Sequence, residues 1–250
     1  MCIVIVRQGQ DRFAFAVAAG LRDRGWPVLE IDPVTLADQS VSLSDNTFEV
    51  DGRKVSGLLF RAGTRGPFSQ GFVLQDKSFV DAEVAAVWMA AMNLSTMTSL
   101  NRLDAEAWCL GNLWIIWRRF LLENGVPLAP MSYGTEPQSK AEQWLPYGAL
   151  CTHVVPGERA GACLLAPLVG SPSPERSLFV CGSILRGGTT NVLIKVAELL
   201  CQRGINLAEG LVNRDGQLVA INLLPDVEDS EIDCVRSRVV AYYEANLSAG

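Results

Sequence analysis

The stretch Ile194–Asp226 constrains the fold most, because it predicts a helix and a β-hairpin in direct succession. Gly204 supplies the stop for the helix. Two strands, Leu207–Val212 and Gln217–Leu223, follow and are joined by a turn that ends in Asp-Gly. The apolar face of the helix recurs at helical spacing, at Val196, Leu199, Leu200 and Ile205. The order predicts a compact helix–hairpin unit.

The beginning of the chain predicts a βαβ unit. Cys2–Val6 has the continuous apolar character of a buried parallel strand, Asp11–Arg24 has helical periodicity, and Val28–Ile31 is a second strand. A hairpin around Asp51-Gly52 and a central strand at Gly57–Phe60 extend this Rossmann-like opening. The first turn lacks the G-x-G-x-x-G pattern, which argues against a dinucleotide site.

Composition narrows the class of protein. The 250 residues are 49% hydrophobic and carry a formal charge of -6, with a pI near 4.9. The negative charge argues against nucleic acid or an acidic membrane as partner, and no apolar run is long enough to span a bilayer. Seven cysteines without a Cys-x-x-Cys pattern indicate reduced thiols and a cytoplasmic protein. The single histidine, His153, excludes clustered-histidine metal sites, and its spacing from Cys151 and Cys163 does not specify an activated thiol.

Two helices are predicted in the middle of the chain, Phe79–Met92 and Asp104–Asn124. The second helix holds Trp108, Trp114 and Trp117, whose exposure would be costly. They therefore belong to the core or to an interface between subunits, so a homodimer is one expectation. The remaining predicted elements are strands and a final helix, at Tyr147–Val155, Ala162–Val169, Leu178–Leu185 and Asp233–Leu247.

A glycine-rich loop after the central strand, Arg61–Phe72, is the first candidate binding segment. Open α/β sheets usually bind ligands where such strands end. Arg61 and Arg65 can fork onto a carboxylate or phosphate. The alternative is a mobile connection with solvated arginines.

Several segments resemble the ATP-grasp enzymes, the ATP-dependent carboxylate–amine ligases. The resemblance lies in the "N-x-x-P" exit Asn222–Pro225, the "v-N-x-p"-like step at Leu100–Arg102 and the "GipvP"-like transition Asn124–Pro130. It implies an α/β fold with a Rossmann-like preATP-grasp domain at residues 1–97. A truncated ATP-grasp-like domain is expected at residues 98–250.

The chain departs from the ATP-grasp pattern where the metal should bind. The family's glutamate in "E-x-N-x-x-P" is replaced by Ala220, and Leu211 lies near the earlier acidic position. The family's two lid lysines have one counterpart at most, Lys140, between residues 131 and 176. The candidate substitute carboxylates are Glu209, Asp215, Asp226 and Glu228, of which the last two are also consistent with a solvated acidic loop before the last helix.

The resemblance, together with the missing metal ligands and lid lysine, predicts a protein that no longer catalyses ligation. It would act as a binding or accessory subunit for a peptide, a small metabolite or a partner protein, with no cofactor. The alternatives are an active ligase that uses ATP and magnesium through relocated ligands, and a structural dimer.

The expected ligand site brings Arg61 and Arg186 toward Asn191 and Asn222, which favours an anionic small molecule or peptide. Arg186 and Asn191 match an arginine that faces the phosphates and a "tN" step in the family. In the competing arrangement, each arginine pairs with a nearby acid such as Asp32 or Glu209.

Overall fold

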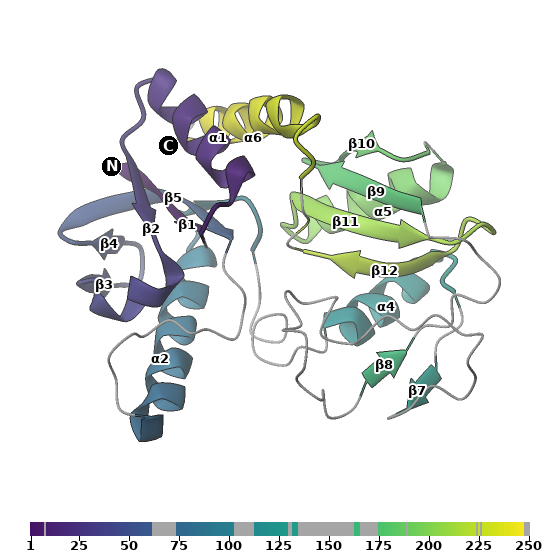
Figure 1. Cartoon of the computed structure of the whole chain (residues 1–250), viewed down its shortest axis with the longest axis horizontal. Coiled ribbons are helices and arrows are strands. Elements are labelled where there is room, and N and C mark those ends of the chain that lie inside the picture. Colours follow the sequence, from purple (N-terminus) through teal and green to yellow (C-terminus); the bar gives the residue numbers. More distant parts are fainter. Residues whose placement is uncertain are drawn as a thin grey trace. The chain divides into compact units, whose positions relative to one another are not determined.

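A computed structural model describes residues 1–7, 9–61, 74–102, 113–129, 132–134, 163–165, 175–188, 190–223, 225 and 227–247. The chain divides into two compact units (Figure 1). The first unit comprises Met1–Cys109 and Asp226–Gly250, and the second comprises Leu110–Pro225. The expected domain boundary at residue 97 stays a prediction.

The first unit is built on a six-stranded sheet with the strand order β2-β1-β5-β4-β3, and β6 lies beside β5. Its elements are β1 (Cys2–Arg7), α1 (Arg12–Asp23), β2 (Val28–Ile31), the 3₁₀ helix η1 (Pro33–Asp38), β3 (Val41–Leu43), β4 (Phe48–Val50), β5 (Arg53–Arg61), α2 (Leu74–Met92), β6 (Thr98–Ser99) and α6 (Ile232–Leu247). Strand β1 runs parallel to both β2 and β5. The predicted βαβ unit is therefore confirmed.

Strand β5 corrects one expectation. The second arm of the predicted hairpin and the separate central strand are one continuous strand, Arg53–Arg61. Asp51 and Gly52, at φ 49° and 70°, form the turn that precedes it. β5 is therefore antiparallel to β4 on one side and parallel to β1 on the other. A single strand joins the hairpin to the parallel core.

Helix α6 returns from the end of the chain to the first unit and lies beside α1 (Figure 1). Its predicted apolar face is confirmed, because Val235, Val239, Val240 and Tyr243 are all buried. Gly57 of β5 makes room for it, since a Cβ there would lie 3.3 Å from the Tyr243 ring. The Tyr243 hydroxyl donates a hydrogen bond to the Leu58 carbonyl at 2.7 Å. The last helix thus completes the core of the first unit.

The second unit contains an antiparallel sheet with the order β10-β9-β11-β12, with α5 against β9 and β10, and a two-stranded sheet of β7 and β8. Its elements are α4 (Leu113–Glu123), β7 (Ser132–Gly134), β8 (Cys163–Leu165), β9 (Glu175–Val180), β10 (Ser183–Arg186), α5 (Asn191–Gln202), β11 (Leu207–Val212) and β12 (Leu218–Asn222). The predicted helix–hairpin unit corresponds to α5, β11 and β12 and is confirmed.

The expectation of one strand over Leu178–Leu185 is wrong. Strands β9 and β10 form a hairpin around Cys181 and Gly182, whose φ angles of 48° and 73° reverse the chain. Cysteine is uncommon with a positive φ, so the sequence carries only half of the usual turn signal. The hairpin brings Arg186 back beside β9 rather than to the end of one long strand.

Several expectations fall outside the described residues, among them Arg65, Lys140, His153 and the strand Tyr147–Val155. Trp117 is half-buried and packs edge-on against Phe120, with ring centroids 5.7 Å apart. The side chains of Trp108 and Trp114 are not described, so a dimer formed through this helix stays a prediction. Within the described part of the chain, no helix combines the length and apolar character needed to cross a membrane.

Candidate functional site

One row of side chains crosses the four-stranded sheet of the second unit. Glu209 of β11 lies directly opposite Asn222 of β12 and, on its other side, opposite Leu178 of β9. Arg186 of β10 is in turn the partner of Leu178. Residues directly opposite each other in a sheet share a face. Arg186, Glu209 and Asn222, which are far apart in the sequence, therefore lie on one face of the sheet.

The next row contains the two positions at which the ATP-grasp resemblance calls for acids. Leu211 and Ala220 are direct partners in the β11–β12 ladder, and Ala220 is completely buried. Both expected metal-ligating positions are therefore apolar and adjacent. No cluster of three or more His, Cys, Asp or Glu side chains suited to a metal occurs among the described residues.

Glu209 is instead bound by arginine. A guanidinium nitrogen of Arg186 lies 2.6 Å from its carboxylate, and the two side chains are only 17% and 2% exposed. The Nε of Arg176, on a half-exposed side chain, lies 3.6 Å from the same oxygen. The competing arrangement expected for Arg186 is thus confirmed. Arg176 belongs to the next row, opposite Leu211, so two arginines from neighbouring rows lie near one carboxylate.

The other candidate carboxylates of this region do not join the row. Asp215 is exposed in the β11–β12 turn, where its backbone N–H bonds to the side chain of Asn213. Glu228 is also exposed, and Asp226 lies outside the described residues. Asn191 is the exposed first residue of α5, next to the capping residue Thr190. Its expected role in ligand binding stays a prediction.

Arg61 lies at the end of β5 in the first unit. The alternative that it is a solvated arginine is wrong. Its side chain is nearly buried, and its Nε donates to Asp11 at 2.8 Å. The ring of Phe13 lies 5.2 Å from the guanidinium carbon. Arg61 thus pairs with Asp11 rather than with Asp32. The proposed approach of Arg61 to Asn222 joins residues of different units and stays a prediction.

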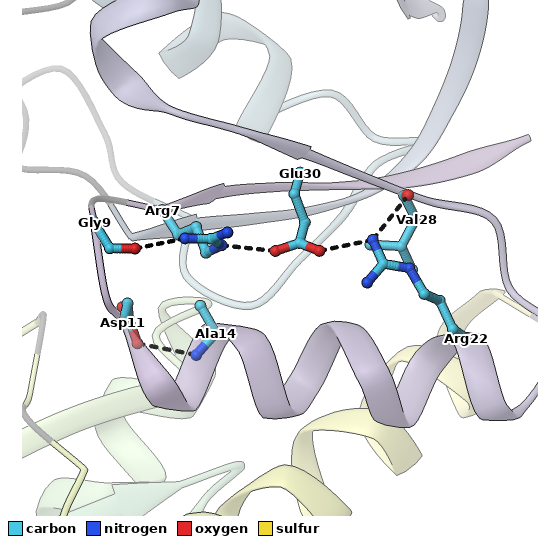
Figure 2. Close-up of polar contacts among 7 residues, drawn as sticks. All are labelled: Arg7, Gly9, Asp11, Ala14, Arg22, Val28 and Glu30. Carbon is cyan, nitrogen blue, oxygen red and sulfur yellow. Dashed lines mark hydrogen bonds and ion pairs between the residues drawn. The ribbon is translucent and has the colours of Figure 1, made fainter.

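A second charged network occupies the ends of β1 and β2, and the sequence reasoning missed it (Figure 2). Glu30 accepts hydrogen bonds from Arg7 and Arg22, each at 2.7 Å. Arg7 also donates to the Gly9 carbonyl at 2.6 Å, and its guanidinium stacks 3.5 Å from the Phe15 ring centre. The available signal was a lone acid in the otherwise apolar strand β2. These hydrogen bonds join β1, α1 and β2, so the network stabilises the βαβ unit.

Burial raises the pKa of Glu30, but the hydrogen bonds and charges of Arg7 and Arg22 outweigh it, so the pKa is lowered. A lowered carboxylate pKa stabilises the fold above the unfolded value of about 4.3, and this stability is lost as the pH falls through the folded value. We expect Glu30→Gln to reduce the free energy of unfolding at pH 7. The difference from wild type should shrink below pH about 4. Urea unfolding between pH 7 and pH 3 measures this difference.

The control is Glu123→Gln. Glu123 forms an exposed pair with Arg119 on α4, and such pairs contribute little. A deficit in Glu30→Gln that stays constant down to pH 3 would show that the lowered pKa does not stabilise the fold.

Comparison with known proteins identifies the fold. No protein-family model and no curated protein sequence matches the chain. Among solved structures, the ATP-grasp ligase PsnB in complex with a minimal precursor, Mg and ADP aligns with 98% of this chain and 97% of its own, at 14% identity and a TM-score of 0.66. The macrocyclase MdnC from Microcystis aeruginosa MRC, bound with precursor peptide MdnA, aligns with 96% of this chain and 99% of its own, at 12% identity and a TM-score of 0.64.

A third structure, the RimK domain protein ATP-grasp from Sphaerobacter thermophilus DSM 20745, aligns with 98% of both chains at 14% identity and a TM-score of 0.57. The chain therefore has the ATP-grasp fold, as the sequence resemblance implied.

Proposed function

We propose that the chain is an ATP-grasp-fold protein that has lost ligation and acts as a binding or accessory subunit, with a peptide as its ligand. The single observation that carries this proposal is the pairing of Leu211 with Ala220 at the expected metal positions. Magnesium bound with ATP requires one or two carboxylates. Glu209, two positions before Leu211 on β11, is buried against Arg186. In this proposal residues 1–97 are the Rossmann-like preATP-grasp domain and residues 98–250 a truncated grasp domain.

The ligand class is supported by the neighbours and by charge. Two of the similar structures are complexes with a precursor or precursor peptide. In the second unit, Arg186 neutralises Glu209 and leaves the half-exposed Arg176 with a looser contact. A half-exposed guanidinium can fork onto a carboxylate. We therefore favour an acidic peptide over a basic one.

Calorimetry tests both parts of the proposal on the full-length protein. Mg-ATP is expected to give no measurable heat of binding in the micromolar range. An acidic synthetic peptide should bind more tightly than a basic peptide of equal length. Arg176→Met should weaken acidic-peptide binding, whereas Arg119→Met, which removes an exposed arginine from α4, should not.

The opposite result supports the second candidate function. Micromolar binding of Mg-ATP that Asn222→Ala abolishes would restore the active ligase with relocated ligands. Release of ADP in the presence of a candidate acid and amine would then confirm catalysis.

A further inference from the structure

One outer edge of the first unit's sheet is formed by β3, whose three residues, Val41–Leu43, are all exposed. Val41 and Leu43 are 38% and 39% exposed and lie on the same face as the buried Phe48 and Val50 of β4. The apolar face of the sheet thus continues to its edge. A further strand beside β3 would bury both side chains.

The backbone of β3 also faces outward at these two residues. Asp51 donates to the Ser40 carbonyl at 2.8 Å, and Ser44 donates to the Thr47 carbonyl at 2.9 Å. Hydrogen-bonded pairs alternate along an antiparallel ladder, so Ser42 also faces β4, and Val41 and Leu43 face away from it. No partner for the N–H or C=O groups of Val41 and Leu43 exists among the described residues.

The strands at the other ends of the two strand orders, β2, β10 and β12, are protected, as natural sheet edges usually are. On β2, Glu30 holds Arg22, which also reaches the Val28 carbonyl. Strand β10 has an irregular register beside Arg186. The outer side of β12 pairs with residues 127–129 through hydrogen bonds to Leu218. In contrast to β2, β10 and β12, strand β3 has no charged side chain, proline or register shift within it.

We infer that β3 pairs with β3 of a second copy of the chain, antiparallel about a two-fold axis at Ser42. The two outward-facing residues lie symmetrically around Ser42, so this register places Val41 opposite Leu43 of the partner subunit at both ends. Both are hydrogen-bonding positions, so the two copies form backbone bonds at each. A shift by one residue would place outward-facing groups against inward-facing ones. The two six-stranded sheets would become one continuous sheet.

The side chains around the axis are compatible with self-pairing. Residues Ser40–Ser44 carry no charge, so the strand meets an uncharged copy of itself. The nearest acids, Asp38 and Asp45, lie outside the strand, in η1 and in the bend before β4. Apolar residues meet apolar residues and serine meets serine. The strand is therefore complementary to itself. Binding of an unrelated peptide would not require this self-complementarity, so it favours a second copy of the chain.

Charge-swap variants test the pairing directly. The double variant Val41→Lys with Leu43→Lys places lysine opposite lysine twice in each dimer. It should raise the dissociation constant about tenfold or more. Val41→Glu with Leu43→Glu should act in the same way. Val41→Lys with Leu43→Glu places opposite charges together and should retain the dimer, as should an equal mixture of the all-lysine and all-glutamate proteins.

Sedimentation velocity of the full chain over a range of concentrations distinguishes 27.1 kDa from twice that mass, about 54 kDa. Circular dichroism and thermal unfolding confirm that each variant is folded. Phe79→Lys and Leu122→Lys serve as controls, because they charge exposed apolar residues of α2 and α4 and should leave the dimer intact.

Three results would overturn the inference. The first is a wild-type protein that is monomeric at every concentration. The second is an all-lysine variant that dimerises as well as wild type. The third is loss of dimer in Leu122→Lys alone, which would place the contact on the tryptophan helix. A monomeric wild type whose all-lysine variant loses peptide binding would assign the β3 edge to the peptide instead.

Discussion

Glu209→Gln is expected to lower the free energy of unfolding of the second unit by about 3 kcal/mol, because it leaves the mostly buried Arg186 guanidinium without this carboxylate. Hydrogen exchange of β9 and β11, read against urea concentration, measures the loss. The matched control is Arg176→Met. That arginine is half-exposed and lies 3.6 Å from the same oxygen, so its removal should cost about 0.5 kcal/mol or less.

A double replacement shows whether the loss of stability comes from a buried charge without its carboxylate or from altered packing. Arg186→Met combined with Glu209→Leu removes both charges and keeps apolar bulk, so it should be more stable than Glu209→Gln alone. Equal destabilisation by the single and the double variants would show that the packing of the row, rather than the uncompensated charge, determines its stability.

Trp88→Ala is expected to destabilise the first unit by about 3–5 kcal/mol, because it removes a large side chain from a closed core. Trp88 of α2 is among the largest fully buried side chains of the described residues. Its ring packs edge-on against Phe48, with centroids 5.2 Å apart, and lies 6.2 Å from Phe60. Hydrogen exchange of β4 and β5 reports on this core.

The control for Trp88 lies on the same helix. Phe79 is largely exposed, so Phe79→Ala should change the stability by about 0.5 kcal/mol or less. If both alanine variants lose the same stability, the contacts of Trp88 contribute no more than those of an exposed ring, because alanine favours the helix at both positions.

Elements with strong local signals could be predicted from the sequence. Strands β2 and β11 have the predicted bounds, because turn residues and charges flank both apolar runs. The last helix and its four buried residues follow from apolar spacing alone. The hairpin of β9 and β10 was missed because a cysteine occupies its first turn position. Local periodicity reveals elements only where ordinary turn residues mark their ends.

The candidate site could be predicted only in part. The sequence shows that Ala220 and Leu211 replace the acidic residues expected from the resemblance. That these two residues pair directly depends on the register of β11 and β12. The Arg186–Glu209 pair was one of two arrangements considered, because a sequence does not specify which acid an arginine will meet. For the same reason the sequence did not identify the partner of Arg61: Asp11, which caps the start of α1, is fifty positions away. Long-range electrostatic contacts are decided by topology.

The return of α6 to the first unit has a consequence for synthesis on the ribosome. The strands of the first unit precede the second unit in the chain, but Tyr243 and its neighbours, which cover Gly57 and pack against α1, emerge only after the second unit. The second unit is continuous in sequence and can complete its sheet as soon as β12 has left the exit tunnel. A nascent chain therefore holds an uncovered β1–β5 face throughout the translation of the second unit. Of the two units, the one whose translation begins first is the last to close.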